Sequence, residues 1–419
     1  MSNNPNNDIL LICNQFPFGH GETFLANEFP YLYENFRKIV ILVRTDANTQ
    51  TRAVPEDVTI LKIPAKSPSK IKLAMLLLKH VYLLAGLLIE EINAISTVYG
   101  KKPNMKQLKK MWHDAVKSIE LASFIKKHIL GRISGNAVLY SYWQNSAAVA
   151  ALLVKKEFPE HKVICRTHRS DLYFYAQEDN YLSFRRFISK NTDKLFFISE
   201  DGMKYQTQLL KKSYAGFVVS RLGVKKEVEL IPKKKSGKRT IVSCSNIIPV
   251  KRIELIVKAL AMVEKIDIEW IHFGGGYLED SVKASAKQML SSKINIEYWF
   301  KGKTENKAIH RFYAENHVDL FINVSESEGL PVSIMEAISY GIPVLATDVG
   351  GTGEIISDTV GKLMKKDLSP AELANHIKTF FKKSSQRINA YAKNAREFGR
   401  SNYSSEKNYN NFIKQIQTL

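Results

Sequence analysis

The chain has 419 residues, of which 45% are hydrophobic and 24% charged, and its formal net charge is +20. This length predicts two domains, and the composition excludes a disordered protein. Three cysteines without metal-ligand spacing exclude a disulfide framework, and they are typical of a protein of the reducing cytoplasm.

The first half of the chain alternates between apolar runs of strand length and intervals of helical pattern. Near-continuous apolar strands separated by helices indicate a parallel sheet that is covered on both faces. The predicted strands are Asp8–Cys13, Lys38–Val43, Ala137–Tyr140, Lys162–Cys165 and Lys194–Ile198.

The positive charge is concentrated in this half. Residues 1–250 hold 38 Lys or Arg against 21 Asp or Glu, whereas residues 251–419 hold 23 against 20. We find no zinc-finger spacing or RNA-binding signature beside the basic runs, so we expect no nucleic-acid partner. An anionic membrane surface, a phosphorylated acceptor and simple solvation of surface lysines remain open explanations.

Residues 71–130 contain two apolar runs that are interrupted by Lys79 and His80. Neither run reaches the roughly 18–20 residues that a membrane-spanning helix needs. Lysines flank both runs, and basic helices with an apolar face can lie on anionic lipid. The alternative is a pair of helices packed against the first domain with their lysines in water, and the two are compatible.

A basic, turn-rich stretch, Ile231–Arg239, separates the two halves. We therefore predict one domain over residues 1–232 and a second over residues 233–402. The strand pattern restarts in the second domain, with predicted strands Thr240–Cys244, Ile268–Phe273, Ile294–Phe300, Val318–Val324 and Pro343–Thr347.

The segment Ser325–Tyr340 places two carboxylates, Glu328 and Glu336, on either side of a predicted loop-to-helix junction. Gly329 belongs to the loop, and Pro331 suits the first helical position. The first turn of a helix attracts anions, phosphates above all. Carboxylates beside it would repel phosphate but can accept hydrogen bonds from sugar hydroxyls. Capping and solvation of an exposed helix is the alternative for each acid taken alone.

The segment Val318–Ile356 resembles the C-terminal signature of retaining glycosyltransferases of family 4. The match comprises Glu328 and Glu336 with seven residues between them, Gly-Leu-Pro after the first acid, and Gly341–Gly351. The resemblance implies the α/β fold called GT-B, in which two Rossmann-like domains face each other across a cleft. It also implies that a helix over residues 403–419 returns to the first domain.

The resemblance assigns the phosphate contacts to the loop after Thr240–Cys244. Lys251 occupies the family's lysine position and would neutralise a diphosphate leaving group. Asn246 stands where the family has arginine, and Arg252 stands where it usually has glycine.

Further donor contacts are implied on both domains, with His168 over the transferred sugar, Asp171 nearby and the nucleobase beside Gly302 and Lys303. The expected catalytic residues are Glu328, His168 and Lys251. The expected donor-binding residues are Glu336, Gly329, Leu330, Pro331, Arg252, Asn246, Gly19, Gly21, Gly275, Gly302, Lys303 and Asp171.

These observations predict a retaining glycosyltransferase of the hexosyltransferase type, which uses a nucleotide sugar, with UDP the expected nucleotide. The expected acceptor is a lipid-linked or polysaccharide chain of cell-surface glycan biosynthesis, such as lipopolysaccharide, at the inner face of the cell membrane. We expect no cofactor and no metal, because no Asp-x-Asp motif or metal-ligand cluster occurs. The alternatives are a GT-B sugar-nucleotide epimerase and a non-catalytic sugar-nucleotide-binding subunit.

Overall fold

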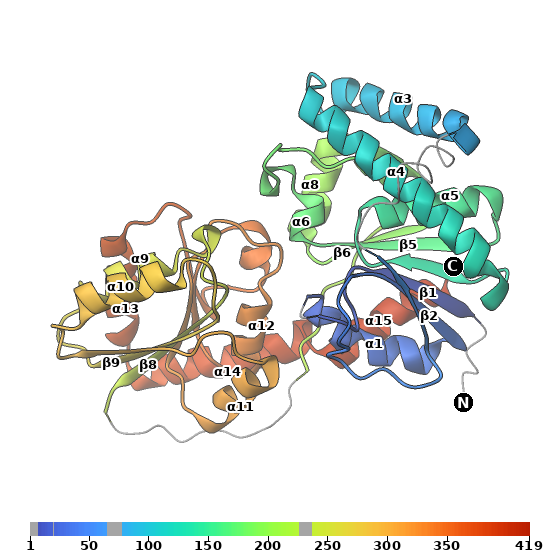
Figure 1. The fold of residues 1–419 in the computed structure, drawn as a ribbon. Helices are drawn as coiled ribbons and strands as arrows, with labels where there is room; N and C mark the ends of the chain where they lie inside the picture. The colour runs from blue at the N-terminus through green and yellow to red at the C-terminus, as the bar shows by residue number, and fades with distance from the viewer. Residues whose placement is uncertain (1–6, 20, 65–77, 226–236) are drawn as a thin grey trace. The chain divides into compact units, whose positions relative to one another are not determined.

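The computed structural model describes residues 7–19, 21–64, 78–225 and 237–419, and the chain forms two compact units (Figure 1). Unit 1 comprises Met1–Leu222 and Lys407–Leu419, and unit 2 comprises Gly223–Glu406. The chain thus passes from unit 1 to unit 2 after Leu222, and the boundary expected at residues 232–233 lies outside the described residues.

Unit 1 is built on a seven-stranded sheet with the order β3-β2-β1-β4-β5-β6-β7, and all neighbouring strands are parallel. After β1, the chain adds β2 and β3 on one side of that strand and then β4 to β7 on the other side. The strand order therefore reverses between β1 and β4. The strands are β1 (Asp8–Cys13), β2 (Lys38–Arg44), β3 (Thr59–Ile63), β4 (Val138–Ser141), β5 (Lys162–Thr167), β6 (Lys194–Phe197) and β7 (Phe217–Val219).

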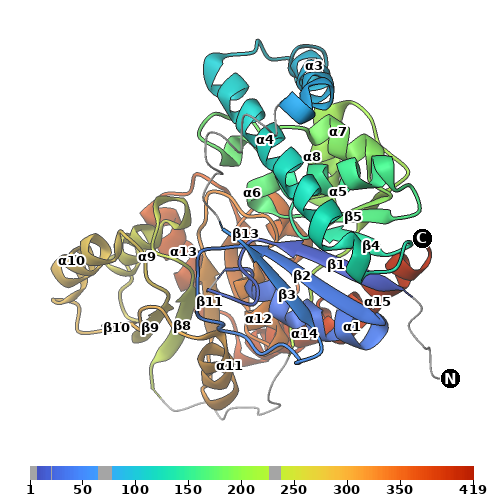
Figure 2. The same ribbon diagram turned by 45° about the vertical axis from the view of Figure 1, so that its right-hand side comes forward.

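Helices cover both faces of this sheet, because alternate strand residues point to opposite sides. Leu10 of β1 packs in a cluster with α4 and α5, whereas the next residue, Leu11, packs with α1 and α15 (Figure 2). The helices of the unit are α1 (Thr23–Asn35), α3 (Val81–Thr97), α4 (Met105–His128), α5 (Ser146–Glu157), α6 (Arg169–Leu172), α7 (Arg185–Asn191), α8 (Glu200–Leu210) and α15 (Ser405–Gln417), with short 3-10 helices at Leu130–Arg132 and Phe174–Ala176.

The chain end belongs to unit 1. Phe412, Ile413 and Ile416 of α15 are buried in the cluster that contains Leu11, and the Phe412 ring lies edge-on to Phe196 of β6. Within the described ranges, none of the helices combines the length and the apolar character that crossing a membrane requires.

Unit 2 is built on a six-stranded parallel sheet with the order β10-β9-β8-β11-β12-β13, so its strand order reverses between β8 and β11. Its strands are β8 (Arg239–Cys244), β9 (Ile268–Phe273), β10 (Ile296–Phe300), β11 (Leu320–Asn323), β12 (Val344–Thr347) and β13 (Gly361–Met364). Its helices are α9 (Ile253–Leu260), α10 (Glu279–Leu290), α11 (Asn306–Glu315), α12 (Val332–Ser339), α13 (Pro370–Phe381) and α14 (Ser385–Asn402), with 3-10 helices η3 (Pro249–Lys251) and η4 (Gly350–Glu354).

The prediction of two Rossmann-like sheets is confirmed, and every strand expected from the sequence is present. Three strands were not expected: β3, β7 and β13. All three lie at an edge of their sheet. An edge strand is paired on one side only and buries less of its surface, so it lacks the continuous apolar run that marks a central strand.

Candidate functional site

The strand order of unit 2 reverses between β8 and β11, so the carboxyl ends of these two strands mark its switch point. In open parallel sheets this switch point is where ligands bind, because the loops on its two sides run in opposite directions and leave a gap. The loop after β8 leads to Lys251, and the loop after β11 leads to Glu328. The two loops are joined by a hydrogen bond from the Glu326 N–H to the Val250 carbonyl, at 2.8 Å.

Lys251 and Glu328 meet at this switch point. The Lys251 Nζ lies 2.5 Å from the Glu328 Oε1, and the Glu328 side chain is only 8% exposed. Asn323, the last residue of β11, donates to the same carboxylate oxygen at 3.3 Å. The structure thus brings together two of the three expected catalytic residues, and it adds Asn323, which the sequence reasoning missed.

Three buried residues, Gly329, Leu330 and Pro331, hold the loop that carries Glu328. The Gly329 carbonyl accepts a hydrogen bond from the Gly351 N–H at 2.7 Å. Gly350 has a φ of +53°, and a Cβ built on it would lie 2.0 Å from the Glu328 carbonyl oxygen. Only glycine fits a backbone that approaches this closely.

α12 begins at Val332, so Pro331 is its N-cap residue and not its first helical residue. Gly341 lies just past the end, as predicted, with a φ of +77°. No side chain caps the start of α12, and its first turn has no acidic residue. This helix start therefore keeps the electrostatic character that suits an anion.

Glu336 is buried in the middle of α12 and is held by α11. The Asn306 Nδ2 donates to its Oε1 at 2.7 Å, and the His310 Nε2 lies 3.5 Å from the same atom. The other His310 ring nitrogen lies 3.0 Å from the Tyr340 hydroxyl. The sequence reasoning missed Asn306 and His310, because nothing in their spacing links α11 to α12.

The loops after β9 and β10 lie beside this site. The Gly274 N–H donates to the Gly302 carbonyl at 2.8 Å, and the Gly275 carbonyl accepts from the Ile247 N–H at 2.9 Å. Lys303 and Asn246, at the same edge of the sheet, are exposed to solvent. The expected donor residues of unit 2 therefore lie on adjacent loops at one edge.

Arg252, which is expected to bind the donor, contacts the protein backbone instead. Its Nε donates to the Val324 carbonyl at 2.6 Å, and its Nη2 is buried without a hydrogen-bond partner among the described residues. Burial lowers the pKa of the guanidinium. The Arg252 side chain is thus hydrogen-bonded just after the end of β11, where it supports the loop that carries Glu328.

In unit 1, the switch point between β1 and β4 places His168 among aromatic rings. His168 follows β5, and its ring centroid lies 4.7 Å from that of Tyr142 and 4.6 Å from that of Trp143. Neither buried ring nitrogen has a hydrogen-bond partner in the described part of the chain. Burial, followed by the nearby Arg166 guanidinium, lowers the pKa of His168 to about 3, so the ring is neutral near pH 7.

Asp171 and Gln144 lie next to this histidine. The Asp171 carboxylate accepts from the backbone N–H groups of His168 and Gln144, each at 2.6 Å. Burial raises the pKa of Asp171 to about 6, against the lowering effect of Arg185. The Gln144 side chain is fully buried, and neither its oxygen nor its nitrogen has a partner among the described residues. Buried polar atoms are usually satisfied, so the unpaired groups of Gln144 and His168 are exceptions among the described residues.

The β1–α1 loop is organised by Glu22, a residue to which the sequence assigned no contact. Its carboxylate accepts from the backbone N–H groups of three residues in the turn after β1 and from the Trp143 Nε1, all at 2.5–2.8 Å. Gly19 and Gly21 surround the Gln15 side chain, whose amide oxygen accepts from the Gly21 N–H at 2.7 Å. The Gly21 N–H is thus already used within the loop.

Ser199, which follows β6, caps α8 by accepting from the Gly202 N–H at 3.1 Å. Glu200 and Asp201 occupy the first turn of that helix, so a phosphate would be repelled there. In the described ranges, no three His, Cys, Asp or Glu side chains gather in an arrangement that could hold a metal ion.

The chain resembles known proteins in both sequence and structure. Residues 224–398 match the family described as glycosyl transferases group 1. The chain is 24% identical over 229 residues to an N-acetyl-alpha-D-glucosaminyl L-malate synthase of Bacillus anthracis, a match that covers 52% of this chain and 58% of the relative. It is 36% identical over 106 residues to the O-antigen biosynthesis glycosyltransferase WbnH of Escherichia coli, covering 25% of this chain and 28% of the relative. The matched region thus spans less than two thirds of either relative.

Solved structures resemble the chain over almost its full length. Anabaena Alr3699/HepE in complex with UDP and glucose superposes with a TM-score of 0.66 at 15% identity, covering 98% of this chain and 99% of that one. The sucrose-phosphate synthase of Thermosynechococcus elongatus gives a TM-score of 0.71 at 13% identity, covering 99% of each chain. At these identities the likeness shows the fold, which is the GT-B fold.

Proposed function

We propose that the protein is a retaining glycosyltransferase that uses a nucleotide sugar, because residues 224–398 match the glycosyl transferases group 1 family and the chain has the GT-B fold. The observation that carries this proposal is the pairing of Lys251 with Glu328 at the switch point of the unit 2 sheet. A cation and a carboxylate fixed beside an uncapped helix start suit a ligand that is anionic at one end and rich in hydroxyl groups at the other.

In this proposal the diphosphate of the donor lies between Lys251 and the start of α12. The ammonium and the helix-terminal N–H groups would meet the charge that develops on the leaving phosphate. Glu328 would accept from hydroxyls of the transferred sugar, and Glu336 from the ribose. Asn306 and His310 would hold Glu336 in place. UDP is the nucleotide we propose, and the UDP complexes of the Anabaena protein support that choice.

For the chemical step we propose front-face displacement with retention. The bond between the anomeric carbon and the leaving phosphate oxygen breaks as the acceptor oxygen bonds to the same carbon, and the acceptor proton passes to the departing phosphate. The unit 2 residues that we assign to the donor, Lys251 and Glu328, supply charge and orientation. No metal ion enters this proposal.

We further propose that the acceptor is carried on an anionic membrane and that α3 contacts its surface. The buried residues of α3 are apolar apart from Glu91, which accepts a hydrogen bond from the Tyr181 hydroxyl. Three more apolar side chains, Tyr82, Ile89 and Ile92, lie on the exposed side of α3 at helical spacing. We call these three residues the α3 stripe. Tyr82 is 91% exposed and Ile89 is 60% exposed. A helix that is apolar on both sides needs a second apolar environment, and a lipid interface provides one.

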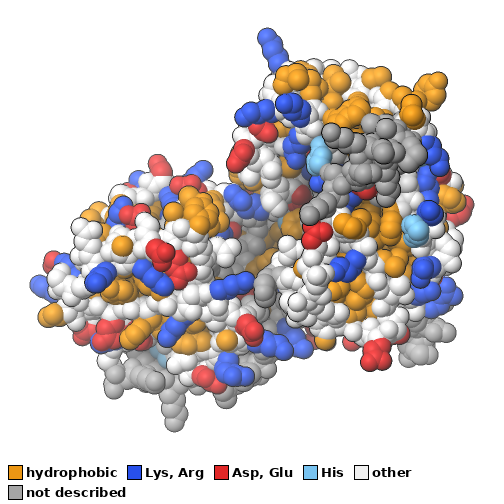
Figure 3. Space-filling view, viewed as in Figure 1, with side chains coloured by type: hydrophobic (Ala, Val, Ile, Leu, Met, Phe, Trp, Pro, Cys, Tyr) orange, Lys and Arg blue, Asp and Glu red, His pale blue; other side chains and the backbone are white. Residues whose placement is uncertain are grey.

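Basic groups accompany the α3 stripe. A hollow of about 370 Å³ beside the start of α3 is lined by Lys79, His80, Tyr82 and Lys156, among others. Figure 3 shows Lys and Arg side chains interspersed with hydrophobic ones over α3 and α4. Cations next to an exposed apolar surface match the phosphate groups of anionic lipids.

The experiment that tests the donor assignment is a panel of UDP-, GDP- and ADP-sugars, followed by nucleotide release with and without lipid vesicles and candidate acceptors. We expect release from a UDP-sugar, and we expect it to disappear in Lys251→Ala and Glu328→Ala. Release that is unchanged in both variants would refute the site. No release from any donor with any acceptor would favour a non-catalytic binding subunit.

A further inference from the structure

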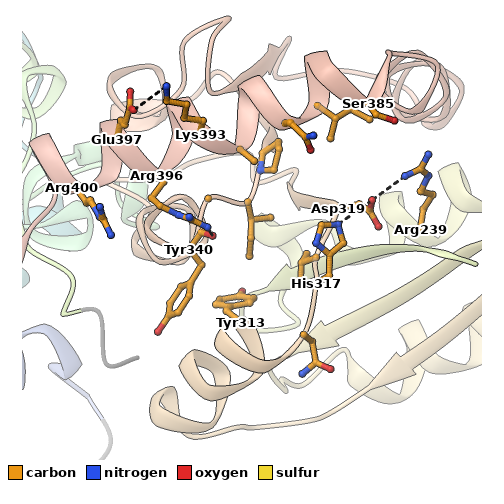
Figure 4. Close-up of a pocket in the computed structure, with 18 residues that line it drawn as sticks. Arg239, Tyr313, His317, Asp319, Tyr340, Ser385, Lys393, Arg396, Glu397 and Arg400 are labelled. Carbon is orange, nitrogen blue, oxygen red and sulfur yellow. Dashed lines mark hydrogen bonds and ion pairs between the residues drawn. The ribbon is translucent and has the colours of Figure 1, made fainter. Parts of the chain in front are cut away.

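Unit 2 contains a cavity at the amino ends of its strands, away from the switch point. The cavity has a volume of about 640 Å³, within the range of small-molecule sites. It lies between α14 and the residues that precede β11 and β12, with Arg239 at the start of β8 (Figure 4). The residues placed at the donor site are at the opposite ends of these strands, so this cavity is a separate site.

The wall of this cavity carries four Lys or Arg side chains and two carboxylates, of which Glu397 lies 3.9 Å from Lys393. Arg396 and Arg400 stand four residues apart on α14, and in Figure 4 both extend toward Tyr340. Arg239 is neutralised across the cavity by Asp319, at 3.2 Å.

The guanidinium of Arg396 is only partly used. Its Nη2 donates to the Tyr340 carbonyl at the end of α12, at 3.2 Å. Its Nε is buried and has no hydrogen-bond partner among the described residues, and the same holds for the hydroxyl of the buried Tyr313 on the cavity wall. The bond to the end of α12 therefore accounts for one nitrogen of Arg396. The Arg396 Nε and the Tyr313 hydroxyl still lack a hydrogen-bond partner among the described residues.

We propose that this cavity binds a phosphate-bearing small molecule. A guanidinium matches the planar spread of phosphate oxygens and binds them in pairs. The wall also carries apolar side chains, including Val318, Ile342 and Ile388, among its polar ones, and these suit an organic group attached to the phosphate. The ligand class is thus an organic monophosphate of modest size.

The cavity is connected to the proposed donor site through one side chain. Tyr340 lines the cavity, and its hydroxyl lies 3.0 Å from His310, which in turn lies 3.5 Å from Glu336. A ligand that shifts Tyr340 would therefore change how Glu336 is held. This coupling rests on the proposed function, whereas the binding site itself does not.

Calorimetric titration with phenyl phosphate tests the site. Because the donor site also attracts phosphate, the titration is made in the Lys251→Ala background. We expect binding to persist there, to weaken at least tenfold on adding Arg396→Gln, and to be unchanged on adding Arg387→Gln, an exposed α14 arginine that does not line the cavity. Benzyl alcohol, which lacks the anion, is expected not to bind.

A second variant tests the site independently, in case Arg396→Gln misfolds. Ala392→Glu places a carboxylate on the cavity wall and keeps the bond between Arg396 and Tyr340, so it should weaken phenyl phosphate binding in a chain with unaltered thermal unfolding. Binding that survives both Arg396→Gln and Ala392→Glu, or that vanishes with Lys251→Ala alone, would overturn the site. Nucleotide affinity that is the same with and without phenyl phosphate would overturn the coupling.

Discussion

Lys251 and Glu328 are 77 positions apart in the chain, yet their side chains meet at 2.5 Å. Both are largely buried, with 20% and 8% of their side chains exposed. Removal of either partner leaves the other charge poorly solvated, so the pair acts as a unit. We expect Lys251→Ala and Glu328→Ala each to lower kcat/KM for sugar transfer about 100-fold or more.

A double-mutant cycle of unfolding free energies isolates this pair. We expect the double variant Lys251→Ala/Glu328→Ala to be more stable than the sum of the single effects implies, by about 1–2 kcal/mol. Lys258→Ala with Glu254→Ala, an exposed pair on α9, is the control and should couple by less than about 0.5 kcal/mol. Additive effects at Lys251 and Glu328 would contradict the pairing.

Gly350 controls the position of Glu328 through the backbone. A methyl group at Gly350 would collide with the Glu328 carbonyl at a φ that disfavours alanine. We expect Gly350→Ala to destabilise the protein by about 2–3 kcal/mol and to abolish donor binding. Gly353→Ala, in the same 3-10 helix, meets the flexible Asp348 side chain and is in ordinary contact with the end of Leu363, so it should cost under about 1 kcal/mol. Equal losses in chemical denaturation would be the contrary result.

Arg252 adopts a left-handed backbone with a φ of +49°, at the position where family 4 usually has glycine. A side chain in this conformation costs about 1–2 kcal/mol. Arg252→Ala removes the bond to the Val324 carbonyl and keeps the strain, whereas Arg252→Gly removes both. We therefore expect the glycine variant to be the more stable of the two by about 1 kcal/mol in urea unfolding. An alanine variant of equal stability would show that the position is unstrained.

His168 makes folding sensitive to acid. Its pKa is about 3 in the folded chain and near 6.5 when unfolded, so between these values the unfolded chain binds the extra proton. Stability then falls as the pH falls below 6.5. We expect the stability of the wild type, measured relative to His168→Gln, to drop by about 2 kcal/mol from pH 7 to pH 5.

The matched control for this pH series is His128→Gln, because His128 is exposed. The pH dependence that is specific to the buried His168 ring should be absent from this control. A flat difference for His168→Gln as well would mean that the ring is solvated, contrary to the buried site described for it. Catalytic activity should show no ionisation of His168 between pH 5 and pH 8.

The α3 stripe predicts a membrane-binding defect that leaves the fold intact. Tyr82→Glu and Ile89→Glu place charges on an exposed helix face, so their thermal unfolding should be unchanged. We expect each to weaken cosedimentation with vesicles that contain anionic lipid at least tenfold. Ile294→Glu, at a fully exposed apolar residue of unit 2, is the control and should bind as the wild type does. Equal binding by all three variants would refute the proposed contact.

The sequence predicted much of the fold, because central strands are buried on both faces and appear as continuous apolar runs. It failed at β3, β7 and β13, whose edge positions leave them partly exposed. It also placed Pro331 one position too far into α12, because the structure makes this proline the N-cap residue.

By itself, the sequence determined two α/β domains and a donor-type segment around Glu328 and Glu336, because strand pattern and helix start are local properties of the chain. The tertiary structure alone decided which distant side chains meet. It paired Lys251 with Glu328, placed Asn306 and His310 on Glu336, and left Gln144 and His168 buried with unpaired polar atoms. These contacts depend on how parallel strands are ordered in each sheet, and that order brings together loops that the sequence keeps far apart.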